Sequence, residues 1–257
     1  MSVTTRHAPG TFCWPELATK DQNAAKRFYS DLFGWSSSDS PIGEGESYTI
    51  FQKNGKDTAA LMQLGAKQAG VPPHWNAYIA VDNVDQSTQK AKQLGGKVQV
   101  EPMDVMDHGR MAVIQDPTGA MFCLWQAKNH AGVGVLNETG ALCWTELLTP
   151  DPAKAKTFYT QLLGWKAEDM PGIAAPYTVF SRSDGTRAGG LMVMPKEAQG
   201  PPAWIGYIQV DDARATNDQA NRSGAKTLAG PMDIPNVGTF AVIMDPQGAV
   251  FGILQGR

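Results

Sequence analysis

The chain has 257 residues and a formal net charge of -3 at pH 7, and 42% of its residues are hydrophobic. These values are typical of a globular protein, and no apolar run approaches the roughly 20 residues that would span a bilayer. Lysine and arginine are scattered and form no basic stripe, so the composition argues against a nucleic-acid partner and against a membrane partner.

The first segment and the cysteines indicate the cellular compartment. Residues 1–10 have neither a basic start nor an apolar stretch and do not resemble a secretory signal, so we expect a cytoplasmic location. Of the three cysteines, Cys13 and Cys143 each precede a tryptophan in an apolar segment. This pattern favours buried, reduced thiols over a disulfide framework.

A strand followed by a helix opens the predicted structure. Alternation predicts a strand over Phe12–Thr19, and apolar residues at helical spacing predict a helix over Asn23–Leu32, which stops before Gly34. Turns rich in Gly, Asn and Pro separate the strand candidates that come next. These candidates are Ser47–Lys53, Ala59–Leu64 and Trp75–Val81.

A second helix restarts the pattern. Helical spacing extends over Asn83–Leu94 and ends at a Gly-Gly pair. The strands predicted after this helix are Lys97–Glu101, Met111–Gln115 and Ala120–Gln126. With Trp75–Val81 as its first strand, this set has the order βαβββ.

The whole pattern then occurs again. Phe12–Trp35 returns as Leu142–Trp165 with Cys, Trp, Glu, Phe-Tyr and Gly-Trp at matching positions, about 130 residues further on. A period this long indicates a duplicated domain, because solenoid repeats have about 20–50 residues. We therefore predict an α+β fold of four βαβββ modules, with domains over 8–127 and 140–257 and a Gly-, Ala- and Asn-rich linker over 128–139.

Each copy carries further marks of one family. An aspartate precedes the Phe-Tyr and Gly-Trp pairs after the first strand, and Asp-Pro-x-Gly precedes the last strand. Together with the paired βαβββ modules, this resembles the vicinal oxygen chelate superfamily, which includes glyoxalase I, bleomycin resistance proteins and extradiol dioxygenases. The resemblance implies two cup-shaped, partly open barrels whose concave faces hold a ligand, and a fused pseudo-dimer.

The family's usual metal ligands are absent from the matching positions. The resemblance implies a His on the first strand, a His or similar residue on the fifth and a Glu on the eighth. Those positions hold Trp14, Asn76 and Cys123 in the first copy and Trp144, Ile205 and Gly252 in the second. Trp, Ile and Gly side chains offer no lone pair suited to a divalent metal, so we expect no metal and no other cofactor.

The cups are expected to hold aromatic and polar side chains instead. Strand alternation turns Trp14 and Glu16 the same way, and likewise Trp144 and Glu146. Each carboxylate is a candidate general acid/base or a hydrogen-bond acceptor for a ligand. His108 is a candidate because its turn is expected near the rim of the first cup. The full set of candidate ligand-binding residues is Trp14, Asn76, Tyr78, His108, Cys123, Trp125, Trp144, Tyr207 and Gln209.

Three functions fit this pattern. The first hypothesis is a metal-independent small-molecule binding protein, with the first cup favoured because it holds more polar groups. The second is a glyoxalase-like lyase or isomerase acting on a small carbonyl compound, with Glu16 or Glu146 as the base. The third is a structural or interaction domain whose aromatic side chains fill the cups. We expect a monomer with an internal pseudo-dimer, or a homodimer.

Overall fold

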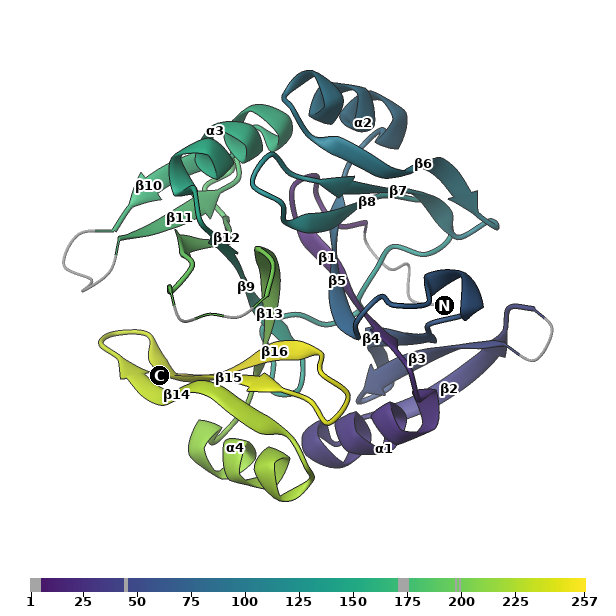
Figure 1. The fold of residues 1–257 in the computed structure, drawn as a ribbon, viewed down its shortest axis with the longest axis vertical. Coiled ribbons are helices and arrows are strands. Elements are labelled where there is room, and N and C mark those ends of the chain that lie inside the picture. The colour runs from purple at the N-terminus through teal and green to yellow at the C-terminus, as the bar shows by residue number, and fades with distance from the viewer. Residues whose placement is uncertain (1–5, 44–45, 171–175, 197, 199) are drawn as a thin grey trace. The chain divides into compact units, whose positions relative to one another are not determined.

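The computed structural model describes residues 6–43, 46–170, 176–196, 198 and 200–257. Its elements follow the predicted order and form four βαβββ modules (Figure 1). The first module comprises β1 (Phe12–Thr19), α1 (Gln22–Phe33), β2 (Ser36–Pro41), β3 (Ser47–Lys53) and β4 (Lys56–Gln63). A short 3-10 helix (Ala66–Gln68) leads to the second, with β5 (His74–Ala80), α2 (Val84–Gln93), β6 (Lys97–Val105), β7 (Gly109–Gln115) and β8 (Met121–Ala127).

The second half repeats this arrangement. The third module comprises β9 (Leu142–Thr149), α3 (Pro152–Leu163), β10 (Lys166–Asp169), β11 (Tyr177–Ser181) and β12 (Arg187–Val193). The fourth comprises β13 (Ala203–Gln209), α4 (Ala213–Arg222), β14 (Lys226–Ile234), β15 (Gly238–Met244) and β16 (Val250–Gly256). The prediction of an α+β fold built from four βαβββ modules is confirmed.

Every module has the same strand pairing. The first strand pairs in parallel with the fourth, as β1 does with β4, and the last three strands form an antiparallel meander. Parallel pairing of β5 with β8, of β9 with β12 and of β13 with β16 repeats the rule. Because a parallel pair needs a crossover connection, the helix lies between the first and second strands of each module.

One strand was missing from the sequence prediction. β2 (Ser36–Pro41) pairs with β3 in antiparallel register, but all six of its residues are exposed. Its sequence, SSSDSP, has no apolar alternation, since neither face of this edge strand covers a core. Its pairing with β3 defines this strand, and hydrophobic patterning could not reveal it.

The helix ends match the sequence signals. The side chains of Asp21 and Asp151 accept hydrogen bonds from the backbone N–H groups of Ala24 and Lys154 and so cap α1 and α3. Gly34 and Gly164 end these helices in the left-handed conformation, with φ of 65° and 69°.

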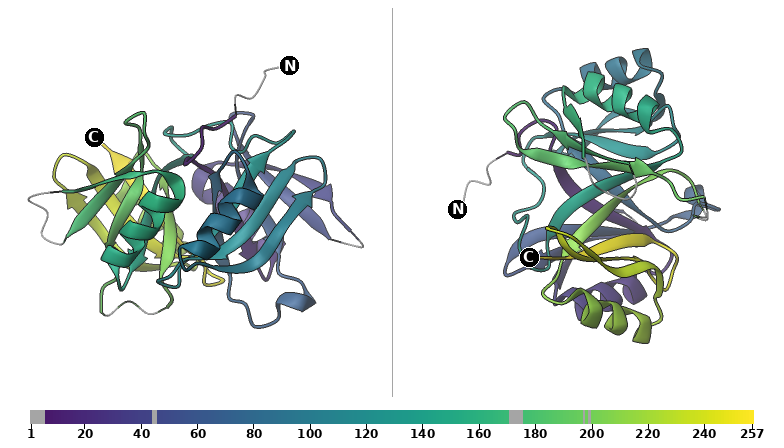
Figure 2. Two further views of the ribbon diagram at one scale, coloured as in Figure 1. Left: turned by 90° about the horizontal axis from the view of Figure 1, so that it is seen from above. Right: turned by 90° about the vertical axis from the view of Figure 1, so that its left-hand side faces the viewer.

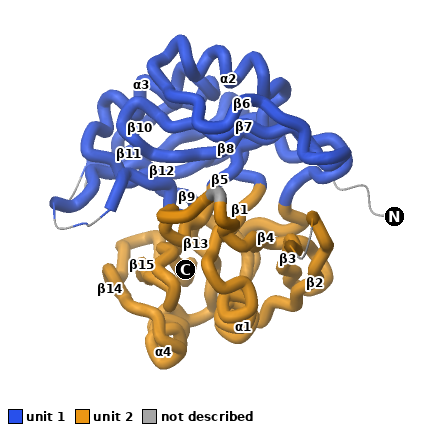
Figure 3. Tube along the Cα trace, turned by 45° about the vertical axis from the view of Figure 1, so that its right-hand side comes forward, with its two compact units in different colours: residues 1–13, 77–132, 144–205 blue, residues 14–76, 133–143, 206–257 orange. Residues whose placement is uncertain are grey.

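The chain divides into two compact units (Figure 3), and each contains one module from each sequence copy. Unit 1 comprises residues 1–13, 77–132 and 144–205, and unit 2 comprises 14–76, 133–143 and 206–257. In unit 1, α2 and α3 lie side by side (Figure 2). Lys90 on α2 donates to the Leu162 carbonyl at 3.3 Å. In unit 2, Gln219 on α4 donates to the Asp31 carbonyl on α1 at 2.9 Å. The domains predicted over 8–127 and 140–257 describe the sequence copies and stay a prediction.

Each unit has a buried polar node in its core. In unit 2, the Tyr29 hydroxyl donates to Asp245 at 2.8 Å and accepts from the Trp75 indole at 3.1 Å. In unit 1, the Tyr159 hydroxyl donates to Asp116 at 2.9 Å and accepts from Trp204 at 2.8 Å. Burial, and next the adjacent aspartate charge, raise the pKa of both tyrosines well above its ordinary value, so the hydroxyls stay protonated.

Cys13 on β1 and Cys143 on β9 are free thiols at equivalent positions of the two copies. Cys13 Sγ lies 3.6 Å from the Tyr78 carbonyl oxygen, and Cys143 Sγ lies 3.4 Å from that of Tyr207. Burial raises the pKa of each thiol to about 12, which suppresses the reactive thiolate. In the part of the chain that the structure describes, no helix is long and apolar enough to cross a membrane.

Candidate functional site

A hydrogen-bonded cluster in unit 2 joins β1 to β3. The Trp14 indole N–H donates to the Tyr48 hydroxyl at 3.0 Å, and that hydroxyl donates to Glu16 Oε2 at 2.7 Å. Trp14 and Glu16 share one face of β1 because they are two residues apart, and both are buried, with 5% and 6% of their surfaces exposed. Tyr48 comes from β3, which lies on the other side of β4, since both β1 and β3 pair with β4.

Asn76 on β5 completes this first cluster. Its amide Nδ2 donates to Glu16 Oε1 at 3.3 Å, so each carboxylate oxygen accepts a hydrogen bond from a different strand. Charge-assisted hydrogen bonds of this kind offset the cost of burying a carboxylate. The first cluster is therefore Trp14, Glu16, Tyr48 and Asn76.

Unit 1 contains a second cluster at the equivalent positions. The Trp144 indole N–H donates to the Tyr177 hydroxyl at 2.9 Å, and Tyr177 is hydrogen-bonded to Glu146. Burial raises the pKa of Tyr177, the Glu146 charge raises it further, and the Arg187 charge partly opposes the shift. Position 205, which corresponds to Asn76, is a buried isoleucine that offers no hydrogen bond. The second cluster is therefore Trp144, Glu146 and Tyr177.

The backbone beneath the two tyrosines differs. Glu16 is in register with Ala60 on β4, whereas Glu146 is in register with Gly190 on β12. A Cβ atom at Gly190 would lie within a bond length or so of the Tyr177 hydroxyl, at 1.9 Å, so the tyrosine occupies the space that a side chain would need. The second cluster thus depends on a glycine that the first cluster does not require.

Tyr78 on β5 and the two candidates on β8, Cys123 and Trp125, lie in unit 1. Tyr78 and Cys123 are in register on these parallel strands, and both are buried. Trp125 packs against Gly109, where an added Cβ would meet its ring at 2.3 Å, and its indole N–H donates to the His130 carbonyl at 3.0 Å. The Tyr78 and Trp125 rings meet edge to face with centroids 6.1 Å apart, which makes an aromatic wall on this pair of strands.

His108 lies in the turn between β6 and β7. It is exposed, its Nδ1 is 3.9 Å from Asp107, and its ring centroid is 6.4 Å from that of His130. The His130 ring centroid in turn is 6.1 Å from that of Trp125. His108 is thus connected to the aromatic wall of unit 1 through one intervening ring.

The remaining candidates lie in unit 2. Tyr207 on β13 packs its ring against Gly252 on β16, where an added Cβ would meet the ring at 2.2 Å. The glycine at this position therefore leaves no gap, because Tyr207 occupies it. Gln209 is at the end of β13. Its backbone N–H donates to the Ala141 carbonyl at 2.9 Å, and its carbonyl accepts from the Gly140 N–H at 2.8 Å.

The donor groups do not suit a divalent metal. Asn76 donates its amide to Glu16, Cys123 is a buried thiol, and the other four family positions hold Trp14, Trp144, Ile205 and Gly252. Over the residues that the structure describes, no group of three or more His, Cys, Asp or Glu could hold a metal ion. The family's metal set does not fit these positions.

The two tyrosines at the centres of the clusters, Tyr48 and Tyr177, were not among the residues predicted from the sequence. A signal was present, because Tyr48-Thr49 is repeated as Tyr177-Thr178 in the second copy. Nothing local on β3 or β11 indicates that these hydroxyls contact a glutamate on another strand. Only the sheet register makes that contact.

Comparison with known proteins places the chain in a family. The model of the family described as Glyoxalase/Bleomycin resistance protein/Dioxygenase superfamily matches residues 11–124 and 141–253. A protein of Mycobacterium tuberculosis named "Putative glyoxylase CFP32" is 44% identical over 99% of this chain and 98% of its own length. The anthracycline biosynthesis protein DauV of Streptomyces sp. is 32% identical over 98% of this chain and 96% of its own length.

Solved structures share the fold. The Mn(II)-bound glyoxalase from Novosphingobium aromaticivorans has a TM-score of 0.66 and 20% identity, over 96% of this chain and 82% of that one. The 2,3-dioxygenase LapB from Pseudomonas sp. KL28 has a TM-score of 0.65 and 13% identity, over 98% of this chain and 94% of that one. At these identities the likeness concerns the fold and not the chemistry.

Proposed function

Because the chain belongs to the glyoxalase/bleomycin resistance protein/dioxygenase superfamily, we propose that it is a metal-independent small-molecule binding protein whose ligand contacts the first cluster. One observation carries this proposal. A buried carboxylate, Glu16, is held by Tyr48 and Asn76 on a strand position beside the one where the family places a metal ligand. In the first copy, the strand positions that the family uses for metal ligands hold Trp14, Asn76 and Cys123.

The cluster's hydrogen-bonding capacity indicates the ligand class. Tyr48 uses its one O–H on Glu16, whereas Asn76 uses only one of its two amide N–H groups there and also carries a carbonyl oxygen acceptor. These groups suit a molecule that offers both a donor and an acceptor. The indole of Trp14 gives a flat apolar contact, which favours a planar compound. A relative named for anthracycline biosynthesis agrees with a planar aromatic ligand.

The first test is binding. Tryptophan fluorescence titrated with planar hydroxyketones of increasing size should show saturable quenching, and Glu16→Gln should lower affinity at least tenfold, or about 1.4 kcal/mol. Glu146→Gln is the matched control in the second cluster and should bind as the wild type does. Unchanged affinity in both variants would remove the carboxylates from the proposal. If neither the wild type nor the variants bind saturably, the result would favour the third hypothesis, in which aromatic side chains fill the cups.

A second candidate is a lyase or isomerase acting on a small carbonyl compound. The 44% identical relative named as a glyoxylase favours it, as does the presence of a carboxylate beside hydroxyl and amide donors. In this reaction Glu16 would take the C–H proton from a hydroxyl-bearing carbon next to the carbonyl and return it to the former carbonyl carbon. The hydroxyl proton would move to the former carbonyl oxygen, so that the hydroxyl-bearing carbon becomes the new carbonyl. The Asn76 amide would donate to the oxygen that becomes negative.

Metal analysis and turnover separate the two candidates. Elemental analysis of the purified protein is combined with methylglyoxal and glutathione turnover before and after chelation. Absence of both metal and turnover supports the binding protein, and turnover that survives chelation but not Glu16→Gln supports the second candidate. A stoichiometric metal with chelator-sensitive turnover would contradict both.

We further propose that the protein works in the cytoplasm as a monomer or homodimer, with a small molecule as its ligand and neither nucleic acid nor membrane as a partner. The net charge of -3 supports the last point, because a phosphate backbone binds basic surfaces. Light scattering of the purified protein measures the oligomeric state directly.

A further inference from the structure

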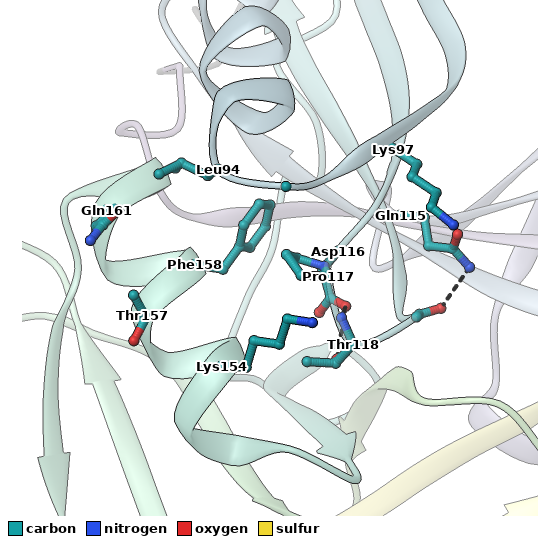
Figure 4. A pocket seen from close by; sticks show the side chains of 12 residues that line it. Leu94, Lys97, Gln115, Asp116, Pro117, Thr118, Lys154, Thr157, Phe158 and Gln161 are labelled. Carbon is teal, nitrogen blue, oxygen red and sulfur yellow. Dashed lines mark hydrogen bonds between the residues drawn. The ribbon is translucent and has the colours of Figure 1, made fainter.

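Unit 1 contains a pocket apart from the clusters. Its volume is about 700 Å³, and it lies where the end of α2, the turn between β7 and β8 and the side of α3 from Lys154 to Gln161 meet (Figure 4). Leu94, Pro117 and Phe158 give it an apolar side. The remaining lining side chains are polar or charged, including Lys97 and Lys154.

The two lysines supply positive charge that is not neutralised. Neither ammonium group has a hydrogen-bond or ion-pair partner in the described ranges of the chain. In Figure 4 the amines of Lys97 and Lys154 lie on either side of the turn formed by Asp116 to Thr118. Both groups are therefore available to a molecule in the pocket.

The one carboxylate in the pocket wall is already occupied by its own turn. Asp116 Oδ1 accepts from the Thr118 backbone at 2.7 Å, the Thr118 hydroxyl at 2.8 Å and the Ala120 backbone at 3.0 Å. Its Oδ2 accepts from the Tyr159 hydroxyl at 2.9 Å. The side chain is 3% exposed, so its charge is directed at these donors more than at the pocket.

The position of Lys154 also favours an anion. Lys154 lies in the first turn of α3. That turn contains no acidic residue, and the Asp151 carboxylate caps the helix. A cation there faces the positive end of the helix dipole, an unfavourable arrangement that a bound anion relieves. Gln161 and Thr157, further along α3, add polar groups to the same wall.

Unit 2 differs at the equivalent positions. Lys154 corresponds to Ala24, and Thr118 corresponds to Gln247. The Gln247 side chain lies across the turn and bonds the Asp21 backbone twice, accepting from its N–H at 2.7 Å and donating to its carbonyl at 2.8 Å. In unit 2 the Gln247 side chain thus connects the turn to the start of α1. In unit 1 the Thr118 side chain instead donates to Asp116 within the turn.

We propose that the unit 1 pocket binds a small molecule through an acidic group, a carboxylate or a phosphate, held by Lys97 and Lys154. The apolar side formed by Leu94, Pro117 and Phe158 accommodates a short carbon skeleton, as in a small organic acid or a sugar phosphate. This site is separate from the Glu16 cluster and is independent of the function proposed for that cluster.

The test is titration of the intact protein with inorganic phosphate and with malonate at constant ionic strength, followed by calorimetry and by amide NMR shifts. We expect one saturable site, with shifted amides around Thr118 and Lys154. Lys154→Ala and Thr118→Gln, which imports the unit 2 residue, should each lower affinity at least tenfold. Lys226→Ala, at the unit 2 position that matches Lys97, is the control and should bind as the wild type does.

The outcomes are distinct. Saturation by one anion alone supports the site and names its acidic group. Absence of saturable binding by both anions, or equal affinity in wild type, Lys154→Ala and Thr118→Gln, overturns it. Circular dichroism melts show that the variants are folded, and Glu16→Gln should leave anion binding unchanged, so failure here is separable from failure of the first cluster.

Discussion

The first and second clusters share a chain of hydrogen bonds from tryptophan through tyrosine to glutamate, here called the relay, and they differ in the residues around it. Both have a tryptophan that donates to a tyrosine, which contacts a glutamate. Around this relay, the first cluster has Asn76 and Ala60 where the second has Ile205 and Gly190. The shared part maintains the strand positions, and the differing part determines how many polar groups can meet a ligand. This difference is why we propose that the ligand contacts the first cluster.

The buried nodes around Tyr29 and Tyr159 show the opposite case. Their partners, Asp245 with Trp75 and Asp116 with Trp204, match in type and in geometry. A feature that is identical in both units and lies in the core is explained by packing and hydrogen-bond satisfaction. Equivalence therefore indicates structure, and divergence indicates where to look for function.

The largest expected effect comes from removing a node aspartate. Asp116→Ala and Asp245→Ala each leave buried donors without an acceptor, and Asp245 Oδ1 alone accepts from three backbone N–H groups at 2.8 to 2.9 Å. We expect each to lower the free energy of unfolding by about 3 kcal/mol or more, measured by urea denaturation. Asn substitutions keep one acceptor and should cost less. A change below about 1 kcal/mol in either unit would break the equivalence of the nodes.

The next effect tests the glycine beneath the second cluster. Gly190→Ala places a methyl group against the Tyr177 hydroxyl, so we expect about 1–3 kcal/mol of destabilisation from the forced shift. Changing Ala60 to Gly in the first cluster makes space instead, and it should cost about 1 kcal/mol or less. Thermal unfolding compares the pair. Equal effects of the two changes would show that the clusters have the same tolerance.

Alkaline pH should weaken the fold in a measurable window. The pKa of Cys13 and of Cys143 is raised to about 12 in the folded protein, above an ordinary value of about 8.5–9. The stabilisation is fully present below pH 9 and is lost as the pH rises toward 12, at about 1.4 kcal/mol per pH unit for each thiol. Urea denaturation at pH 8 to 11 measures this slope, and Cys13→Ala should reduce it by one thiol's share. An unchanged slope in that variant would contradict the assignment.

The smallest effect concerns the tyrosines of the relays. Tyr48→Phe and Tyr177→Phe each remove a hydroxyl that connects an indole to a carboxylate, and we expect about 1 kcal/mol of destabilisation for each. Ligand affinity sharpens the comparison, because only Tyr48→Phe should alter it. Equal loss of affinity in both variants would assign a ligand to each cluster.

Much of the fold was predictable from local patterns. Helix ends are encoded within a few residues, as the caps Asp21 and Asp151 and the stop at Gly34 show. Both ends of α1 were predicted to within one residue. The repeat then gave the equivalence of Glu16 with Glu146 directly. β2 could not be found, because its six exposed residues carry no hydrophobic period.

The site was predicted in part. Alternation along β1 correctly put Trp14 and Glu16 on one face, and both are buried. Tyr48 was not connected with them, because its contact with Glu16 depends on how β1 and β3 each pair with β4. The contact of Gln247 with Asp21 likewise joins residues 226 positions apart.

The sequence by itself determined the four modules, their order and the residues that correspond between the copies, because these depend on local periodicity and on the duplication. Tertiary structure decided which strands supply a hydroxyl to each glutamate, which glycine makes room for it and which side chain crosses a turn. Those contacts depend on strand register and on packing between distant segments, and neither is encoded in any short stretch of the chain.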